Sequence, residues 1–117
     1  MYVDPALVEF VVRMVNATRQ PKDYGVAEIG KYIQFGASPR ASINLILAAR
    51  ALAYMRGRTH VRPQDVLDLT HDVLRHRLVL TYEALSDGIT SDALITKVIE
   101  RIPMPKEPLH EHVAANA

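Results

Sequence analysis

The residues with the clearest chemical potential lie in one short segment, Gly36-Ala-Ser-Pro-Arg-Ala41, directly before a long apolar stretch. Ser38 followed by Pro39 is a typical helix start, because the serine oxygen can accept an amide hydrogen and the first helical position needs no donor. Arg40 then stands in the first turn, where a positive charge opposes the helix macrodipole. Its side chain should lean back toward the helix N-terminus, so that free amides, the Ser38 hydroxyl and the Arg40 guanidinium converge. This combination predicts an anion site, and above all a phosphate site.

The same residues also have a simpler interpretation. Ser38-Pro39 can be no more than a favourable helix start, and Arg40 a solvated surface charge. Gly36 and Ala37 carry little side-chain bulk, so either a ligand or another backbone segment could approach them closely. From the local chemistry alone, both interpretations stay open.

The histidines do not form a ligand pattern. His71 and His76 lie five residues apart, whereas two ligands on one helical face need a spacing of three or four. His110 and His112 are close together, but they belong to a proline-rich tail. We therefore expect no metal site.

A basic cluster, Arg75-His76-Arg77, could touch phosphate, brace the domain against a neighbouring one or stay solvated. Nothing in the sequence brings the nearby carboxylates together as an acid/base pair, and no Ser/His/Asp order supports nucleophilic catalysis. The carboxylates considered are Asp68, Asp72 and Glu83.

Prolines mark the predicted helix starts. Pro5 and Pro39 follow the capping residues Asp4 and Ser38, whereas Arg62, an unusual cap, precedes Pro63. The apolar spacing predicts helices over 5–18 and 39–56, with Gly57 as a left-handed cap, and a third helix from residue 63. Because the central helix is apolar nearly all round, we expect it to be the buried spine of the domain.

The rest of the chain is less regular. We predict an irregular connection with one short element over residues 20–37. A short helical run is predicted at 73–74, and a short strand at 78–82. After the Asp87-Gly88 turn, Ser91 is predicted to cap a last helix that ends near Ile102. The fold class is mainly α: a small helical bundle with room for one short strand or hairpin. We expect a domain over residues 1–102 and a disordered tail over 103–117.

Composition narrows the function classes. The 117 residues are 49% hydrophobic and 23% charged, with a net charge of +1 and no cysteine. The absence of cysteine excludes disulfides and thiol catalysis, and the small charge gives no electrostatic case for nucleic acid or an anionic membrane. No signal peptide or membrane span is visible. We expect a soluble, cytoplasmic domain.

Three ordered motifs resemble one protein family. The segment Gly36–Ala41 with the Leu/Ala-rich helix behind it resembles the second-sensor segment of MoxR-family AAA+ ATPases. The stretches 57–66 (GRTHVRPQDV) and 73–78 (VLRHRL) resemble the next two segments of that family, in the same order and with similar spacing. The match extends over about residues 4–82.

The resemblance implies that the chain is the helical lid that follows a nucleotide-binding α/β core, cut from a longer ATPase. The role of the second-sensor arginine would fall on Arg40, which would reach the terminal phosphates of ATP, with Ser38 and Pro39 setting the helix start. Since no Gly-x-x-x-x-Gly-Lys-Ser/Thr loop is present, ATP and its magnesium would be held by the core, and this chain alone should be inactive. The family further implies chaperone-like remodelling, a hexameric ring and a partner with a von Willebrand A-type domain.

A second hypothesis from a different class is a free-standing helical module that binds protein or nucleic acid. It is motivated by a set of basic residues: Arg56, Arg58, Arg62, Arg75 and Arg77. The small net charge and the lack of aromatic residues among these arginines argue against nucleic acid.

Overall fold

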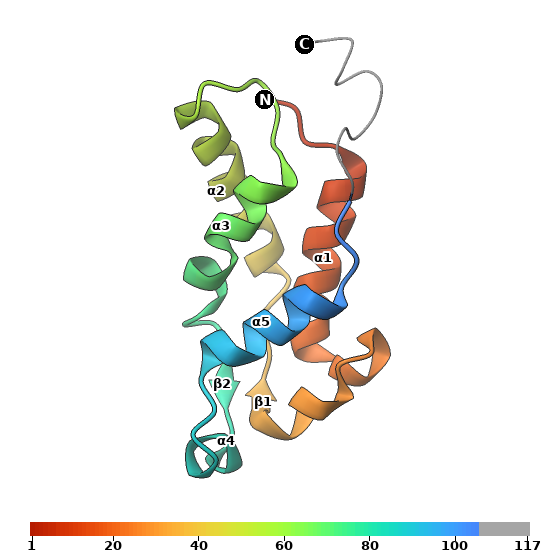
Figure 1. Ribbon diagram of the computed structural model, residues 1–117, viewed down its shortest axis with the longest axis vertical. Helices are drawn as coiled ribbons and strands as arrows, with labels where there is room; N and C mark the ends of the chain where they lie inside the picture. Colours follow the sequence, from red (N-terminus) through yellow and green to blue (C-terminus); the bar gives the residue numbers. More distant parts are fainter. Residues whose placement is uncertain (106–117) are drawn as a thin grey trace.

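The computed structural model describes residues 1–105 and confirms the mainly α fold (Figure 1). Of the predicted tail, residues 106–117 lie outside the described part of the chain, so the domain boundary stays a prediction. The elements in chain order are α1 (Pro5–Arg19), the 3-10 helices η1 (Pro21–Tyr24) and η2 (Ala27–Tyr32), β1 (Ile33–Phe35), α2 (Arg40–Met55), α3 (Pro63–Leu74), β2 (Val79–Leu80), α4 (Tyr82–Ser86) and α5 (Ser91–Arg101).

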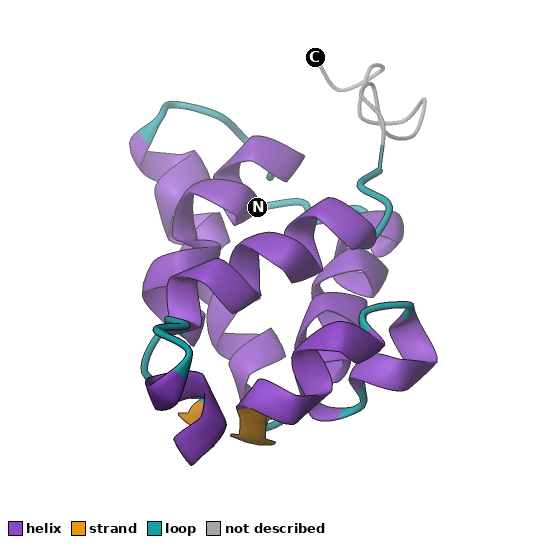
Figure 2. Cartoon of the chain, turned by 60° about the horizontal axis from the view of Figure 1, so that its bottom comes forward, coloured by secondary structure: helices purple, strands orange, loops and turns teal. Residues whose placement is uncertain are grey.

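The four longer helices surround the core. In Figure 1, α2 and α3 lie side by side, α1 stands on the other side, and α5 crosses in front of them. The two strands and α4 gather at one end of the molecule, which comes forward in Figure 2. Buried side chains from all four helices fill the centre, among them Leu7, Phe10, Met14, Leu45, Ala49, Val66, Leu94 and Val98. No helix in residues 1–105 has both the length and the apolar composition needed to cross a membrane.

The first helix forms as predicted. Asp4 caps it, and its Oδ1 accepts a hydrogen bond of 2.8 Å from the backbone N–H of Ala6, while Pro5 occupies the first helical position. The helix ends at Arg19, one residue beyond the predicted end. Its buried residues recur at three- and four-residue steps, which is why one face enters the core.

The segment 20–37 is more ordered than predicted. It contains η1, η2 and β1, and β1 pairs with β2 in an antiparallel two-stranded sheet. Ile33 stands opposite Leu80 and Phe35 opposite Val79, with an irregularity between the two pairs. The predicted strand at 78–82 is thereby confirmed in its first half, whereas its partner strand was missed because the pairing is distant in sequence.

Three local predictions in the second half of the chain need correction. The helical run at 73–74 is the last turn of α3 rather than a separate element. A short helix, α4, follows β2 directly, because the Thr81 hydroxyl accepts a hydrogen bond from the N–H of Ala84. Thr90, one residue before the predicted cap Ser91, caps α5 by accepting from the N–H of Ala93 at 3.2 Å.

Candidate functional site

The segment predicted to bind an anion is anchored on the last turn of α1. The backbone N–H of Ala37 donates a hydrogen bond of 3.0 Å to the hydroxyl of Thr18. Next to it, Gly36 packs so closely on α1 that a Cβ at this position would lie 2.3 Å from the Thr18 carbonyl oxygen. Within the chain, the close approach foreseen at Gly36 is therefore made by another backbone segment.

The start of α2 differs by one residue from the prediction. The helix begins at Arg40, and Pro39 is the N-cap residue, already in helical conformation with φ −56° and ψ −24°. The N–H groups of Ala41 and Ser42 donate to the carbonyls of Ser38 and Pro39 at 2.9 and 3.1 Å. These two amides are therefore not free for an anion, because the fixed φ of proline lets the first turn close upstream. No side chain caps this end.

The guanidinium of Arg40 is exposed at this helix end. Within residues 1–105 it forms no ion pair or hydrogen bond, and the following residue, Ala41, is completely buried. Ser38 and Pro39 are also exposed beside it. The structure thus places Ser38 and Arg40 at one exposed point, with a rigidly packed backbone behind it and an arginine that is available to a ligand.

An apolar, exposed face of α2 continues from Arg40. Ile43, Leu47 and Tyr54 follow at helical spacing on the same side and are 59%, 54% and 76% exposed. The expectation that this helix is buried all round is therefore wrong. Only its opposite side enters the core, through Ala41, Leu45, Ala49 and Ala53. A contiguous exposed apolar face on one helix is typical of a docking surface.

Two of the arginines considered for nucleic-acid binding instead hold a buried carboxylate. The side chain of Asp65 is fully buried. Nη1 of Arg56 lies 3.0 Å from its Oδ1, and Arg58 pairs with the same oxygen. Burial raises the pKa of Asp65, but hydrogen bonds from Arg58 and from the backbone N–H of Arg62, together with the nearby arginine charges, outweigh it and lower the pKa. The bond from Arg62 N–H at 2.9 Å also explains how α3 starts without a usual capping residue.

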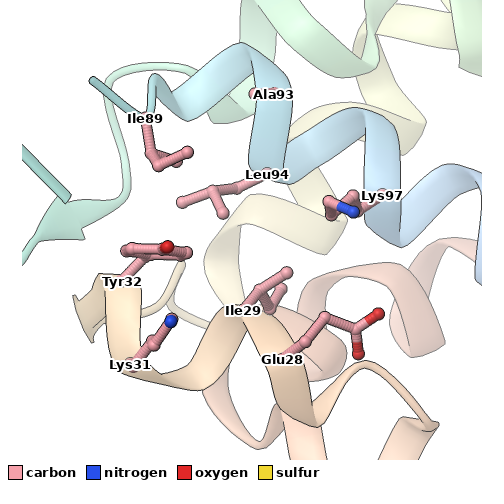
Figure 3. Close-up of a pocket in the computed structure, with 8 residues that line it drawn as sticks. All are labelled: Glu28, Ile29, Lys31, Tyr32, Ile89, Ala93, Leu94 and Lys97. Carbon is pink, nitrogen blue, oxygen red and sulfur yellow. The ribbon is translucent and has the colours of Figure 1, made fainter. Parts of the chain in front are cut away.

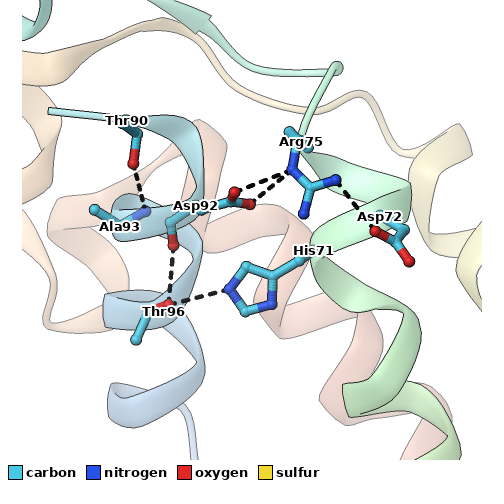
Figure 4. Close-up of polar contacts among 7 residues, drawn as sticks. All are labelled: His71, Asp72, Arg75, Thr90, Asp92, Ala93 and Thr96. Atoms are coloured by element: carbon cyan, nitrogen blue, oxygen red, sulfur yellow. Dashed lines mark hydrogen bonds and ion pairs between the residues drawn. The ribbon is translucent and has the colours of Figure 1, made fainter.

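The predicted basic cluster at 75–77 is divided. Arg75, the residue after α3, donates to Asp92 of α5 at 2.9 Å and to Asp72 of α3 at 3.1 Å (Figure 4). It therefore ties α3 to α5 inside the domain, whereas His76 and Arg77 are exposed. Of the five arginines considered for nucleic-acid binding, Arg56, Arg58 and Arg75 are therefore engaged in ion pairs within the domain.

His71 and His76 have different surroundings in the described part of the chain. Nε2 of His71 lies 3.0 Å from the Thr96 hydroxyl on α5 (Figure 4), and His76 is exposed at the end of α3. Among residues 1–105, no three His, Cys, Asp or Glu side chains form a group that could hold a metal ion. His110 and His112 lie outside the described residues.

A pocket that sequence reasoning did not anticipate opens between η2 and α5. Its volume is about 270 Å³, and the apolar side chains at its centre include Ile29, Tyr32, Ile89 and Leu94 (Figure 3). No residue of the 36–41 segment lines it. Little in the sequence indicated this pocket, because the η2 segment has no clear hydrophobic periodicity.

Comparison with known proteins identifies a family. The AAA lid domain family matches residues 27–98. The chain is 50% identical over 105 residues to Chaperone MoxR1 of Mycobacterium tuberculosis, a match that covers 90% of this chain and 28% of that protein. It is 36% identical over 110 residues to Protein MoxR of Paracoccus denitrificans, covering 89% of this chain and 32% of that protein.

A solved structure has the same fold. The crystal structure of a protein from Cytophaga hutchinsonii that was assigned as an ATPase superposes with a TM-score of 0.85 at 36% identity. The match covers 89% of this chain and 32% of that one. In both kinds of comparison, the chain spans about a third or less of the proteins that it matches.

Proposed function

Because the chain belongs to the AAA lid domain family and is the lid of a MoxR-like AAA ATPase, we propose that it closes over ATP and presents Arg40 to the phosphates. The observation that carries this proposal is the exposed Arg40 guanidinium, which has no partner within residues 1–105 and stands on the first residue of α2. An arginine in this position is otherwise unfavourable because it opposes the helix dipole. The attraction between a bound phosphate and the guanidinium would outweigh this repulsion.

The residues present fit one part of an ATP site. Arg40 offers a planar donor that can grip two phosphate oxygens, and the exposed Ser38 hydroxyl beside it can donate one further hydrogen bond. The sequence has no phosphate-binding loop, and no described group of carboxylates could hold magnesium. In our proposal, the core domain holds ATP and magnesium, and this chain adds positive charge where negative charge must be stabilised during phosphoryl transfer.

The exposed apolar face of α2 supports docking on that core. Ile43 and Leu47 lie on the same side of the helix as Arg40, so a surface that covers them would also meet the guanidinium. Movement of the lid against the core would then couple the state of the nucleotide to the shape of the ATPase.

The activity of the whole protein is a further part of the proposal. The relative from Mycobacterium tuberculosis is named a chaperone, which supports ATP-driven remodelling of partner proteins. We propose that the ATPase works as a ring, hexameric by family resemblance, in the cytoplasm, and that a protein with a von Willebrand A-type domain is among its partners.

The decisive experiment measures ATP turnover and ATP affinity of the full-length ATPase with Arg40→Ala. We expect kcat/KM to fall roughly 10- to 100-fold, because a donor to the transferred phosphate is lost. Arg40→Lys should recover part of the loss, since it keeps the charge but not the bidentate geometry. Arg13→Ala is the matched control: Arg13 is exposed and pairs with Glu9 on its own helix. Unchanged turnover and affinity in Arg40→Ala would overturn the proposal.

A further inference from the structure

The side chain of Thr18 connects the end of α1 to the start of α2. Its hydroxyl donates to the carbonyl of Val15 at 2.6 Å and accepts from the N–H of Ala37 at 3.0 Å. Thr18 is 1% exposed and Ala37 is completely buried, so water cannot replace this acceptor. Loss of the hydroxyl would leave the Ala37 N–H buried without a partner.

Two further contacts surround this hydrogen bond. On one side, the backbone of Gly36 lies directly against the Thr18 carbonyl, where no side chain fits. On the other side, Ala41 packs into a buried cluster with Ala37 and with Val15 of α1. The chain is thus held on α1 at Ala37, three residues before Arg40, and packs into the same buried cluster again at Ala41, the residue after it.

Arg40 itself contributes nothing to its own placement. Its side chain makes no hydrogen bond or ion pair with the rest of residues 1–105, so within the described chain only the backbone sets the position from which the side chain extends. No side chain caps the helix start, and the Thr18–Ala37 bond is a side-chain hydrogen bond that holds the segment three residues before Arg40.

We infer that Thr18 is a positioning residue for Arg40: through the N–H of Ala37, its hydroxyl fixes the helix start that aims the arginine at the phosphates. The inference rests on the proposed function, since it assigns Thr18 a role in the same phosphate contact. Small displacements of a charged donor have large effects on rate, because stabilisation of the transition state depends on preorganised geometry.

The test is a double-mutant cycle in the full-length ATPase with Thr18→Val and Arg40→Ala. Valine keeps the branched shape and replaces the hydroxyl with a methyl group. We expect Thr18→Val to lower kcat/KM about fivefold with Arg40 present, as the loss of one buried hydrogen bond would produce. In the Arg40→Ala background the same substitution should have no further effect. Thr18→Ser, which keeps the hydroxyl, should restore most of the turnover.

Thr70→Val is the matched control. Thr70 is also completely buried, and its hydroxyl donates to the carbonyl of Val66, so this hydrogen bond lies within α3 and not between α1 and the segment before α2. Its turnover should equal that of the unchanged enzyme. If Thr18→Val does not yield folded protein, Thr18→Cys, whose sulfur is a much weaker hydrogen-bond acceptor than the hydroxyl, is used in the same cycle.

The outcomes separate the two proposals. If Arg40→Ala lowers turnover and Thr18→Val does not, or if Thr18→Val has the same effect in both backgrounds, the positioning role is overturned and the phosphate role of Arg40 stands. If Arg40→Ala has no effect, the proposed function fails, and the inference fails with it.

Discussion

The carbonyl oxygen of Thr18 occupies the space that a side chain at Gly36 would need, with 2.3 Å between that oxygen and an ideal Cβ. The two residues are 18 positions apart and belong to α1 and to the segment before α2. This contact makes the end of one helix the support for the start of the next, and Arg40 stands four residues beyond it.

The first prediction concerns this contact. Gly36→Ala should lower the free energy of unfolding by about 2 kcal/mol or more, because the obstructing atoms are backbone and cannot move aside cheaply. Gly30→Ala is the control, since a Cβ at Gly30 would meet no atom within 4 Å. Urea unfolding of the three chains measures the difference, and equal midpoints for Gly36→Ala and the unchanged chain would contradict it.

Arg40 should matter for function and not for folding. Arg40→Ala should change the free energy of unfolding by less than about 0.5 kcal/mol, because the side chain is exposed and makes no contact that stabilises the domain. Arg58→Ala should lower it by about 2 kcal/mol, since Arg58 pairs with the buried Asp65. Thermal and urea unfolding of both variants measure these changes in the free energy of unfolding. A clear loss of stability in Arg40→Ala would point to a structural role instead.

Asp65 should make stability depend on pH. Its pKa in the folded chain lies below the ordinary value of 3.8, so the folded state binds fewer protons than the unfolded state in this range. The stabilisation is therefore fully present above about pH 4 and is lost as the pH falls through the folded pKa. Asp65→Asn should cost about 3 kcal/mol at pH 7, because Arg56 and Arg58 lose the buried carboxylate with which they pair.

The measurement is urea unfolding at pH 7 and at several values between 4 and 2. The difference between Asp65→Asn and the unchanged chain should shrink over the acidic range. Asp23→Asn, at an exposed carboxylate of η1, controls for the loss of one negative charge. A difference that does not vary with pH would show that the arginines do not act on an ionised Asp65.

The exposed face of α2 should be needed only when the core domain is present. Leu47→Gln should leave the unfolding of this chain within about 0.5 kcal/mol of its original value, because Leu47 is already 54% exposed. In the full-length ATPase the same change should weaken docking and reduce ATP turnover several-fold. Val12→Gln on α1, at a residue 38% exposed, serves as the control. Equal turnover in the two variants would argue against docking through this face.

Local sequence signals were sufficient to predict most of the long helices. The caps and prolines at Asp4-Pro5 and Pro63 located α1 and α3, and Gly57, with φ +77°, ends α2 as predicted. The order of three motifs was sufficient to identify the MoxR-like lid family, which the comparisons confirm. These features depend on residues that are close together in the chain, and therefore they can be predicted from the sequence alone.

Tertiary structure decided the rest. The sequence could not show that β1 pairs with a strand more than 40 residues away, that α2 exposes Ile43 and Leu47, or that Arg75 is held by Asp92. It determined that Arg40 stands at a helix start, but only the packing of Gly36 against Thr18 determines how that start is held. The physical reason is range: capping and periodicity act over a few residues, whereas burial, pairing and close backbone contact depend on segments that meet only in the folded chain.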